Sequence, residues 1–410
     1  MQTYDMIIVG AGIAGLRTAL EFKKLKPNSK ILILEMYKQA GGRMETIHTT
    51  VDNKKIQYES GAGRINANHF KLIKLVKNYG LHLIPLSKEL LWRKYGTNKS
   101  EPNTFEAFWF TLCKELNKLP TEIKRQKTLR DLAIDVLGVD LAKSLLEKYA
   151  YRAELEVASA ESSIDMYTSM SPQFYVLKEG FSALTEKMLQ DVKKHKITVL
   201  YNHKAIRVED NKVLTEKDAK YHTFMGKRVV LAVHRNALQF IYPFSPEHPL
   251  VKAVTMEPLL RIYSVYKDSS WFPKHHLITN SPLRNIIPIS QESGLIMSSY
   301  VDARDIELWT DLYKKDKADE LKEKIHNDTT ALFPEANIPQ PPTYTQAQFW
   351  RDGVSYWKTN TNYKKLSEEA LQAYPNLHVV GESFSTKQQW VEGSLEHADR
   401  LIALIKSQST

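Results

Sequence analysis

Cysteine is nearly absent from this sequence, and long apolar runs are missing altogether. Cys113 is the only cysteine among 410 residues, so neither an intrachain disulfide nor a cysteine-based metal cluster can form. No stretch approaches the roughly 18 consecutive apolar residues of a membrane-spanning helix. No signal peptide precedes Tyr4–Val9, which already reads as a buried strand. The sequence therefore predicts a soluble protein in the cytoplasm.

Basic runs, internal repeats, low-complexity tracts and long Gly/Ser linkers are missing as well. The net charge is +10 and the pI is about 9.2, a charge that attracts nucleic acid, membrane surfaces or anionic substrates. The lysines are scattered, whereas nucleic-acid binders gather them into runs. The charge is interpreted as a solvated surface, and nucleic-acid binding is not expected as the main role.

The amino-terminal pattern is that of a βαβ unit. The apolar strand Tyr4–Val9 is followed by a glycine turn, by helical spacing over Leu16–Leu25 and by a second apolar strand, Ile31–Leu34. This order predicts a parallel sheet covered by helices on both faces. Apolar residues make up 42% of the chain and charged residues 25%, as expected of a globular protein with two or three domains.

The glycine turn carries a dinucleotide-binding motif. One glycine permits the tight turn, one lets the backbone approach a pyrophosphate, and one lets helix and strand pack closely. The helix that begins here directs its amides at the phosphates. Glu35 ends the second strand, where a carboxylate accepts the adenosine ribose hydroxyls and disfavours a 2′-phosphate. The predicted cofactor-binding residues are Gly10, Gly12, Ile13, Ala14, Gly15 and Glu35.

A second glycine motif, Gly41-Gly42-Arg43, follows the second strand. Nothing in an NAD enzyme requires a double glycine and an arginine at this place. An extended FAD needs a second close backbone approach, and a cation beside its phosphates and flavin. We therefore add Gly42 and Arg43 to the predicted cofactor site and expect FAD.

These motifs together resemble the amino-terminal signature of the flavin monoamine oxidase superfamily. The superfamily includes monoamine and polyamine oxidases, L-amino acid oxidases and histone lysine demethylases, with protoporphyrinogen oxidase and phytoene desaturase as distant members. The resemblance implies an α/β fold: a Rossmann-like FAD-binding domain of the glutathione-reductase type with an inserted α+β substrate domain. It covers roughly half of the chain.

The resemblance continues through Tyr58–Arg64, where the family places a Gly-Ala or Gly-Pro pair against the flavin. It implies cofactor contacts for Gly61, Ala62, Gly63 and Arg64. L-amino acid oxidases have an arginine at the position of Arg64 that pairs with the substrate carboxylate, and a guanidinium suits bidentate carboxylate binding. The alternatives left open are that Arg64 contacts FAD or a neighbouring acid.

Three middle segments extend the resemblance. Leu177–Leu189 is similar to the family's glycine-rich lead into a helix, and Asn202–Val208 to a strand whose backbone near Ala205 holds the adenine. Arg228–Val233 is similar to an apolar family strand. The family usually continues with proline, but His234 follows here, so this turn is expected to differ.

Arg261 is a departure from the family pattern. The resemblance places it in Leu259–Tyr263 at the position of a family lysine that holds a water near flavin N5 and is thought to help reoxidation by O₂. An arginine keeps the positive charge but cannot lose it. The physiological electron acceptor is therefore left open, as is the alternative that the register is wrong and Arg261 lies on the surface.

The carboxy-terminal block is the most specific part of the resemblance. Gly381-Glu382 resembles a motif whose strand end and acid contact the FAD ribityl and phosphate region, and Trp390–Ser394 resembles an aromatic-X-Glu-Gly-Ala segment. The helix that opens at Val391 can direct its amides at the pyrimidine edge of reduced flavin. The residues implied in cofactor contact are Gly381, Glu382, Trp390, Val391 and Ser394.

Trp390 is also implied as an aromatic wall beside the reacting amine. A second wall is expected from the preceding strand, and the candidates are Trp350, Tyr356 and Trp357, with Trp357 the first choice. Two such rings orient an amine over the flavin. The predicted substrate-side residues are thus Arg64, Arg261, Trp357 and Trp390. No metal site is expected.

The remaining patterns suggest how the chain is divided. Residues 86–170 read as mostly helical, residues 258–310 and 343–359 as strands, and residues 316–332 as a helix between them. We predict a discontinuous FAD-binding domain from residues 1–85, 176–245 and 370–410. The substrate-binding domain is predicted from residues 86–175 and 246–369.

The function implied is oxidation of a small-molecule amine to an imine, with hydride transfer to flavin N5 and reoxidation by O₂ to give H₂O₂. FAD is expected to be non-covalent. Monoamine oxidases attach it through a cysteine late in the chain, whereas the only cysteine here is Cys113, in the segment expected to be helical. The alternatives are an L-amino acid substrate, a desaturase or porphyrinogen oxidase, and a flavin-binding protein without turnover. The sequence gives no indication of the oligomeric state.

Overall fold

A five-stranded parallel sheet forms one half of the computed structural model, which describes residues 2–309 and 311–408. Its strands in spatial order are β11 (Thr198–Leu200), β3 (Ile31–Leu34), β2 (Met6–Val9), β15 (Val229–Leu231) and β21 (Leu377–Val379). All neighbouring pairs are parallel. The predicted α/β fold is confirmed. Three distant parts of the chain build the sheet. The boundaries of the FAD-binding and substrate-binding domains remain a prediction.

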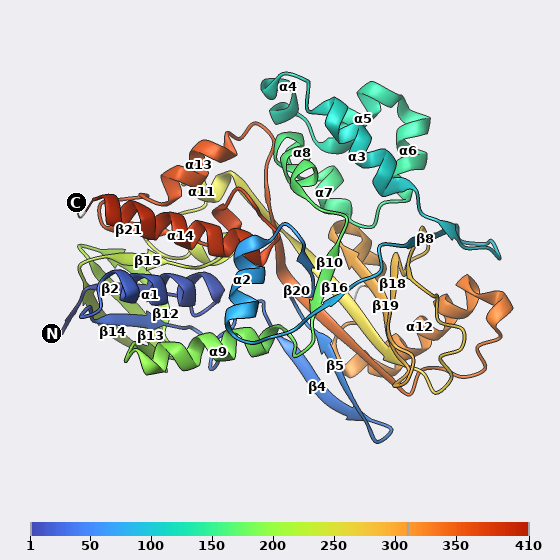
Figure 1. Ribbon diagram of the computed structural model, residues 1–410, viewed down its shortest axis with the longest axis horizontal. Coiled ribbons are helices and arrows are strands. Elements are labelled where there is room, and N and C mark those ends of the chain that lie inside the picture. The colour runs from blue at the N-terminus through green and yellow to red at the C-terminus, as the bar shows by residue number, and fades with distance from the viewer. Residues whose placement is uncertain (1, 310, 409–410) are drawn as a thin grey trace.

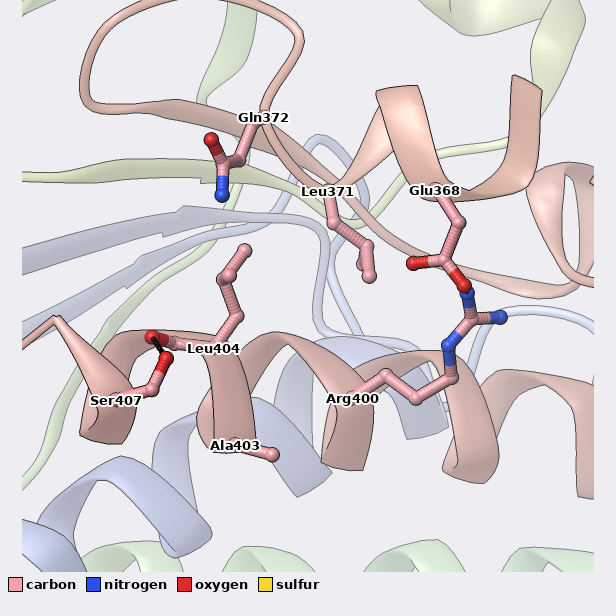
Figure 2. A pocket seen from close by; sticks show the side chains of 7 residues that line it. All are labelled: Glu368, Leu371, Gln372, Arg400, Ala403, Leu404 and Ser407. Atoms are coloured by element: carbon pink, nitrogen blue, oxygen red, sulfur yellow. Dashed lines mark hydrogen bonds and ion pairs between the residues drawn. The ribbon is translucent and has the colours of Figure 1, made fainter. Parts of the chain in front are cut away.

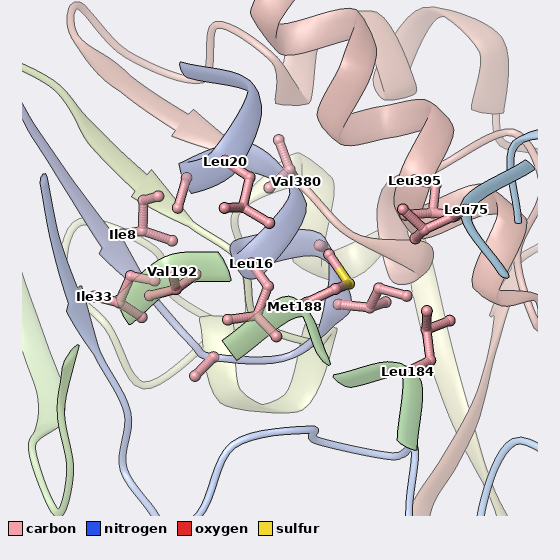
Figure 3. Close-up of a cluster of buried hydrophobic side chains, with 14 of the residues drawn as sticks. Ile8, Leu16, Leu20, Ile33, Leu75, Leu184, Met188, Val192, Val380 and Leu395 are labelled. Atoms are coloured by element: carbon pink, nitrogen blue, oxygen red, sulfur yellow. The ribbon is translucent and has the colours of Figure 1, made fainter. Parts of the chain in front are cut away.

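Helices cover one face of this sheet. They are α1 (Ile13–Leu25), α2 (Phe70–Asn78), α9 (Phe181–Lys194) and α14 (Val391–Ser407), and both chain ends lie in this half of the molecule (Figure 1). Apolar side chains one and two turns apart on these helices meet the strands in a single core. Figure 3 shows Leu16 and Leu20 of α1 between Ile8 of β2 and the residues of α9 and α14.

A four-stranded sheet and short helices lie on the other face. The sheet has the order β1 (Thr3–Tyr4), β14 (Lys220–Gly226), β13 (Lys212–Lys217) and β12 (Lys204–Glu209). The helices that contribute to this second core are α10 (Arg235–Leu238), α11 (Pro249–Lys252) and α13 (Tyr363–Ala370). The parallel strands are therefore buried on both sides, which accounts for their unbroken apolar sequences.

A seven-stranded mixed sheet forms the other half of the molecule. Its order is β20 (Tyr344–Trp357), β16 (Val254–Val265), β19 (Leu295–Asp302), β18 (Asn285–Ser290), β17 (His276–Thr279), β8 (Leu90–Arg93) and β9 (Glu101–Pro102). The long strands β16 and β20 run between the two halves (Figure 1). Helix α12 (Ala318–Leu332) packs on this sheet.

Strands β8 and β9 interrupt residues 86–170, which are otherwise mostly helical, as expected. β8 pairs in parallel with β17, almost 190 residues later in the chain. Four residues are too few to show a period of two, and the strand is stabilised by a distant partner rather than by local sequence.

The rest of that segment is helical, as predicted. It contains α3 (Phe105–Leu116), α4 (Thr121–Gln126), α5 (Leu129–Leu137), α6 (Val139–Glu147), α7 (Arg152–Glu156) and α8 (Ala160–Ser169). Helices α3 to α6 project from the body of the molecule (Figure 1). Residues of α3, α5, α6 and α8 form the core around Trp109 and the buried, free Cys113.

Short strands connect the two halves. The hairpin of β4 (Thr46–Val51) and β5 (Lys54–Glu59) leads into a loop, and a small sheet has the order β6 (Ile65–Asn66), β10 (Phe174–Leu177), β7 (Leu83–Pro85). Four 3₁₀ helices complete the description: η1 (Ala303–Trp309), η2 (Lys315–Lys317), η3 (Pro334–Ala336) and η4 (Glu382–Phe384).

The described residues contain neither a membrane-spanning helix nor a metal-binding cluster. No helix within residues 2–309 and 311–408 is long and apolar enough to cross a membrane. Nor do three His, Cys, Asp or Glu side chains in these ranges gather closely enough to hold a metal ion.

Candidate active site

The first glycine turn links β2 to α1, and two of its glycines are required by the fold itself. Gly10 has a φ of +102°, and a Cβ there would lie 2.5 Å from the Ala232 carbonyl oxygen. A Cβ at Gly15 would lie 2.0 Å from the carbonyl oxygen of Gly10. Both positions therefore exclude any side chain, and the turn and the start of α1 are fixed without a ligand.

Gly12 is different, because nothing in the protein requires a glycine there. Its φ of −72° and ψ of 177° are ordinary extended values, and a Cβ would meet no atom within 4 Å. The open space lies at the start of α1, where no side chain caps the helix and the amides of Ile13 and Ala14 begin the first turn. This is a cradle that fits the approach of a pyrophosphate.

Glu35 lies beside this cradle, at the end of β3. Its Oε2 accepts a hydrogen bond from the Ala11 backbone N–H (2.7 Å), and its Oε1 accepts one from the Tyr37 N–H (2.9 Å). Burial raises the pKa of this carboxyl, against the effect of the backbone hydrogen bonds. Each oxygen retains a lone pair for the ribose hydroxyls of a dinucleotide.

Strand β12, whose backbone is expected to hold the adenine, lies at the same end of the site. The backbone N–H of His203 donates to the Glu35 carbonyl oxygen at 2.8 Å, so β12 begins beside Glu35. Ala205 is buried on β12 opposite Thr215, next to a β-bulge. The predicted role of Ala205 as a backbone contact remains a prediction.

The second glycine motif packs directly against the first. Gly41 donates to the Ala11 carbonyl oxygen at 3.0 Å, and a Cβ at Gly42 would lie 3.6 Å from the Cα of Gly12. The two predicted cofactor motifs therefore form one surface.

Arg43 connects this surface to the carboxy-terminal motif. Its Nη2 lies 2.7 Å from Glu382 Oε2 and its Nη1 donates to the Gly353 carbonyl oxygen at 2.9 Å. Glu382 in turn accepts a hydrogen bond at Oε1 from the Gln389 N–H (2.7 Å). Gly381, with a φ of +132°, makes the turn that places Glu382. Residues 339 positions apart thus meet in one ion pair.

The loop of residues 60–64, between β5 and β6, lies against Arg43 from the other side. A Cβ at Gly61 would be 2.0 Å from the Arg43 carbonyl oxygen, which also accepts a hydrogen bond from the Ala62 N–H (2.9 Å). The predicted flavin-contact residues Gly61 and Ala62 are thus held on the second glycine motif.

Arg261, on β16, lies behind this loop. It is 9% exposed, so the alternative of a surface position is not what the structure shows. Its Nη1 donates to the Gly61 carbonyl oxygen and, at 3.3 Å, to that of Glu59. The Tyr300 ring lies 4.7 Å from its Cζ, and a Cβ at Gly63 would lie 3.3 Å from its Nη1.

Arg64 is half-buried at the end of the same loop. Its Nη2 donates to the Tyr151 hydroxyl, and its Cζ lies 5.6 Å from the centre of the Phe174 ring. Among the described residues no carboxylate forms an ion pair with it. Burial lowers the pKa of Arg64, but the nearby Tyr151 and Tyr300 outweigh burial, and the net pKa is raised. The charge is therefore permanent.

Two buried acids near these arginines do not balance their charge. Burial, followed by the proximity of Asp302, raises the pKa of Glu154 to about 8, and its Oε2 accepts a hydrogen bond from Tyr167 (2.8 Å). Burial likewise raises the pKa of Glu59 to about 7. At neutral pH Glu154 is mostly protonated and Glu59 about half protonated, so the site remains positive.

Trp390 immediately precedes α14 and lies among other rings. The His69 ring is 4.8 Å away at 62°, and the Phe174 ring 6.0 Å away at 30°. Because Arg64 lies on Phe174 as well, the structure brings these two predicted substrate-side residues to one place. Val391 and Ser394 occupy the first turn of α14.

The candidates for a second aromatic wall occupy three different environments. Trp357 is 1% exposed, its Nε1 donates to the Ser385 carbonyl oxygen at 3.0 Å, and the cavity that it lines holds about 10 Å³, room for at most about one water. Tyr356 is buried beside Ala153 and Ala158. Trp350 donates to the Ser60 carbonyl oxygen at 2.8 Å, next to Gly61. The role of Trp357 stays a prediction.

Sequence reasoning missed four residues of this site: His69, Tyr151, Phe174 and Tyr300. They come from the start of α2, the start of α7, β10 and β19. No motif marks them, because each is defined by a partner from a distant part of the chain. The one available signal was the position of His69 five residues after Arg64.

A surface groove of about 420 Å³ lies away from this site. It runs between α13 and α14, with the ion pair of Glu368 and Arg400 at one end and Leu371 and Leu404 along its length (Figure 2). None of the predicted site residues lines it. The site described above is supported by its backbone cradle and its side-chain contacts.

Comparisons with known proteins identify the family and agree with the fold. The family model described as flavin containing amine oxidoreductase matches residues 13–401. The structure of putrescine oxidase bound to putrescine superimposes with a TM-score of 0.78 and 15% identity over 99% of both chains, and a double mutant of that enzyme with 0.76 and 14%. At this identity the likeness shows the fold. The search of curated proteins found no match.

Proposed function

This chain belongs to the flavin-containing amine oxidoreductases and is an FAD-dependent amine oxidase, and from that premise we propose that it oxidises a small primary or secondary amine at the carbon next to nitrogen. When bound, FAD supplies an acceptor for a hydride equivalent at N5 and returns two electrons to O₂, giving H₂O₂. Water hydrolyses the imine product to a carbonyl compound and ammonia, or a smaller amine.

One observation carries the proposal: an ion pair and a hydrogen bond connect the second glycine motif of the cofactor site to the segment of Trp390. Arg43, on the second glycine motif, pairs with Glu382, and Glu382 binds the backbone of Gln389, the residue before Trp390. The phosphate end and the ring that would face the amine are therefore positioned by the same ion pair. Fixed geometry of this kind is what the protein contributes to the reaction.

The charge of the site favours the free base of the substrate. Arg64 and Arg261 are permanent cations without a carboxylate partner among the described residues. A protonated amine would be repelled by both, whereas a neutral amine would not. The free base is also the form that can lose hydride from its α-carbon. We therefore expect kcat/KM to rise with pH as the substrate amine loses its proton.

The experiment is anaerobic reduction of the FAD-loaded protein by pooled amines and, separately, by pooled L-amino acids. Bleaching of the flavin absorbance by an amine, followed by recovery and H₂O₂ formation on admitting O₂, is the expected result. Bleaching without recovery in air would make the protein a dehydrogenase with another acceptor. A flavin that no pool reduces would contradict the proposal. Acid precipitation should release all FAD, because the free cysteine is buried in the helical group.

A second candidate, oxidation of an L-amino acid, is favoured by one observation. Arg64 presents a permanent charge beside Trp390 and Phe174, with a tyrosine hydroxyl as its hydrogen-bond partner. A substrate carboxylate would supply the missing counter-charge.

Arg64→Met tests this candidate with matched substrates, an amine and the amino acid from which it derives by decarboxylation. If the amino acid is the substrate, its KM should rise by about 10- to 100-fold, the size of one or two lost charged hydrogen bonds. If the amine is the substrate, its KM should change by less than about threefold, because it has no group for the guanidinium.

A further inference from the structure

No hydrogen bond of its own fixes the orientation of the Trp390 ring. Its indole Nε1 is buried and has no hydrogen-bond partner, in contrast to Trp350 and Trp357, whose Nε1 atoms each donate to a backbone carbonyl oxygen. The ring of Trp390 is therefore held by packing, and the recorded ring contacts are His69 and Phe174.

The backbone on both sides of the Trp390–His69 contact is clamped. Glu392, in the first turn of α14, accepts hydrogen bonds from the backbone N–H groups of Lys71 (3.0 Å) and Leu72 (2.8 Å), in the first turn of α2. The carboxylate is 1% exposed and satisfies two N–H groups that the helix itself leaves free. His69, the residue before α2, and Trp390, the residue before α14, are thus held next to each other, with their rings edge to face.

The imidazole of His69 is itself fixed in orientation. Its Nδ1 accepts a hydrogen bond from the Asn66 backbone N–H at 3.1 Å, so the proton of the neutral ring is on Nε2. The Asn66 side chain donates a hydrogen bond to the Ser171 carbonyl oxygen and accepts one from the Ser171 backbone N–H. The ring is 95% buried, since its exposure is 5%, and it cannot turn without losing the Asn66 bond.

We propose that His69 is a positioning residue for Trp390: its ring, packed against the indole, holds the indole at the angle that faces the substrate. The proposal rests on the proposed function, in which Trp390 is the wall beside the amine. It assigns His69 a role through its ring rather than through a proton. In agreement, burial and the nearby Lys387 lower the pKa of His69 to about 3.

Two substitutions of His69 separate the packing of its ring on Trp390 from its hydrogen bond to the Asn66 backbone. His69→Asn keeps an acceptor at the position of Nδ1, so the Asn66 N–H stays satisfied, but it removes the ring. His69→Phe keeps a ring against Trp390 but leaves the Asn66 N–H without a partner. A positioning role and a purely structural role therefore predict opposite rankings of the two variants.

The expected result is a crossover. His69→Asn should keep the thermal midpoint of the FAD-loaded protein yet lose roughly three- to tenfold in kcat/KM, the size expected of one lost aromatic contact. His69→Phe should lower the midpoint yet keep kcat/KM within about twofold. Equal kcat/KM in all three proteins, or a larger loss in His69→Phe than in His69→Asn, would overturn the proposal.

A readout independent of turnover completes the test. The protein is labelled with 5-fluorotryptophan, and the ¹⁹F resonance of Trp390 is assigned as the one missing from Trp390→Phe. His69→Asn should shift or broaden that resonance and His69→Phe should leave it near its position; an unchanged resonance in His69→Asn would overturn the proposal. If the wild-type protein oxidises no amine, the proposed function fails, and the resonance alone decides whether His69 orients Trp390.

Discussion

Arg43 and Arg261 both contact the loop of residues 59–64, but their charges are balanced in different ways. Arg43 approaches from the dinucleotide half and is paired with Glu382 at 2.7 Å. Arg261 approaches from the seven-stranded sheet and has carbonyl oxygens and the Tyr300 ring as partners. Arg64, on the same substrate side, has the Tyr151 hydroxyl. The dinucleotide half is therefore neutral at its arginine and the substrate half is positive.

The difference shows how each half recognises its ligand. A pyrophosphate can be held by helix amides and a glycine turn, so the dinucleotide half can use its arginine to connect motifs. The substrate half has two cations whose burial is not offset by an acid, a costly arrangement unless a bound group repays it. A neutral amine tolerates these charges and a carboxylate complements them.

The largest effect is expected from blocking the cradle at Gly12. Gly12→Val places a side chain in space that no protein atom occupies, at ordinary backbone angles, so the apoprotein should fold normally. FAD, however, should be excluded, with affinity lowered at least about 100-fold, because the pyrophosphate and the valine compete for one place. The measurement is FAD titration by fluorescence, together with circular dichroism of the apoprotein.

Gly15→Val is the matched control. Its Cβ would be 2.0 Å from the Gly10 carbonyl oxygen, so this variant should fail to fold whether or not FAD is supplied. A Gly12→Val protein that binds FAD as tightly as the wild type would show that this cradle is not the phosphate site.

The next effect concerns the ion pair itself. Glu382→Gln makes Arg43 resemble the unpaired arginines of the substrate half. We expect a loss of about 2–4 kcal/mol in the free energy of unfolding and faster FAD release, since a half-buried guanidinium loses its counter-charge. Arg43→Gln in the same background should restore part of this loss, as measured by denaturant unfolding of the double-mutant cycle. Additive losses would mean that the pair contributes nothing.

A comparable effect, spread over several pH units, should follow from the protonated acid in the substrate half. Because burial raises the pKa of Glu154 to about 8, the folded state holds a proton that the unfolded state has released above about pH 4.5. Stability is then full below that pH and falls as the pH rises toward 8, by at most about 1.4 kcal/mol per pH unit. Glu154→Gln should flatten this slope in thermal midpoints measured from pH 5 to 9.

Asp302→Asn is the control for that slope. Burial raises the pKa of Asp302 to about 6, so this substitution should flatten the profile below about pH 6; because the Asp302 charge also raises the pKa of Glu154, the upper end of the slope should move to lower pH without disappearing. An unaltered slope in Glu154→Gln would indicate that Glu154 is ionised, and the substrate half would then be less positive than inferred.

The sequence predicted the dinucleotide half in more detail than the substrate half, and the reason is physical. Gly10, Gly15 and Glu35 act within a unit of about 30 residues, so their spacing alone predicts the turn, the helix start and a carboxylate at the position expected to bind the ribose. Strand β8 and its parallel pairing to β17 depend on partners nearly 190 residues apart, which no local period records.

The same limit applies to the residues of the site. The motif positions Arg43 and Glu382 were both predicted, but their ion pair was not. His69 and Phe174 contact Trp390 from α2 and β10, and they belong to no motif. Trp357 was preferred over Trp350 from sequence position, yet it is Trp350 that bonds Ser60 beside the loop. Side-chain contacts between distant segments need the fold to be known first.

The smallest effect at neutral pH is expected where the chain departs from the family's proline. His234 has a φ of −76°, a value that proline adopts without strain, and its Nδ1 accepts a hydrogen bond from the Ala237 N–H at 3.3 Å. His234→Pro should lose this cap but restrict the unfolded chain, so the two effects, each about 0.5–1 kcal/mol, should nearly cancel at neutral pH.

The balance should change with pH. Burial, followed by Arg43, lowers the pKa of His234 to about 4, so the contribution of His234 to the free energy of unfolding is full above about pH 6.5 and is lost as the pH falls toward 4. His234→Pro should therefore unfold at a higher temperature than the wild type at pH 4.5 and at the same temperature at pH 7.5; equal midpoints at both pH values would mean that His234 is not buried in its neutral form.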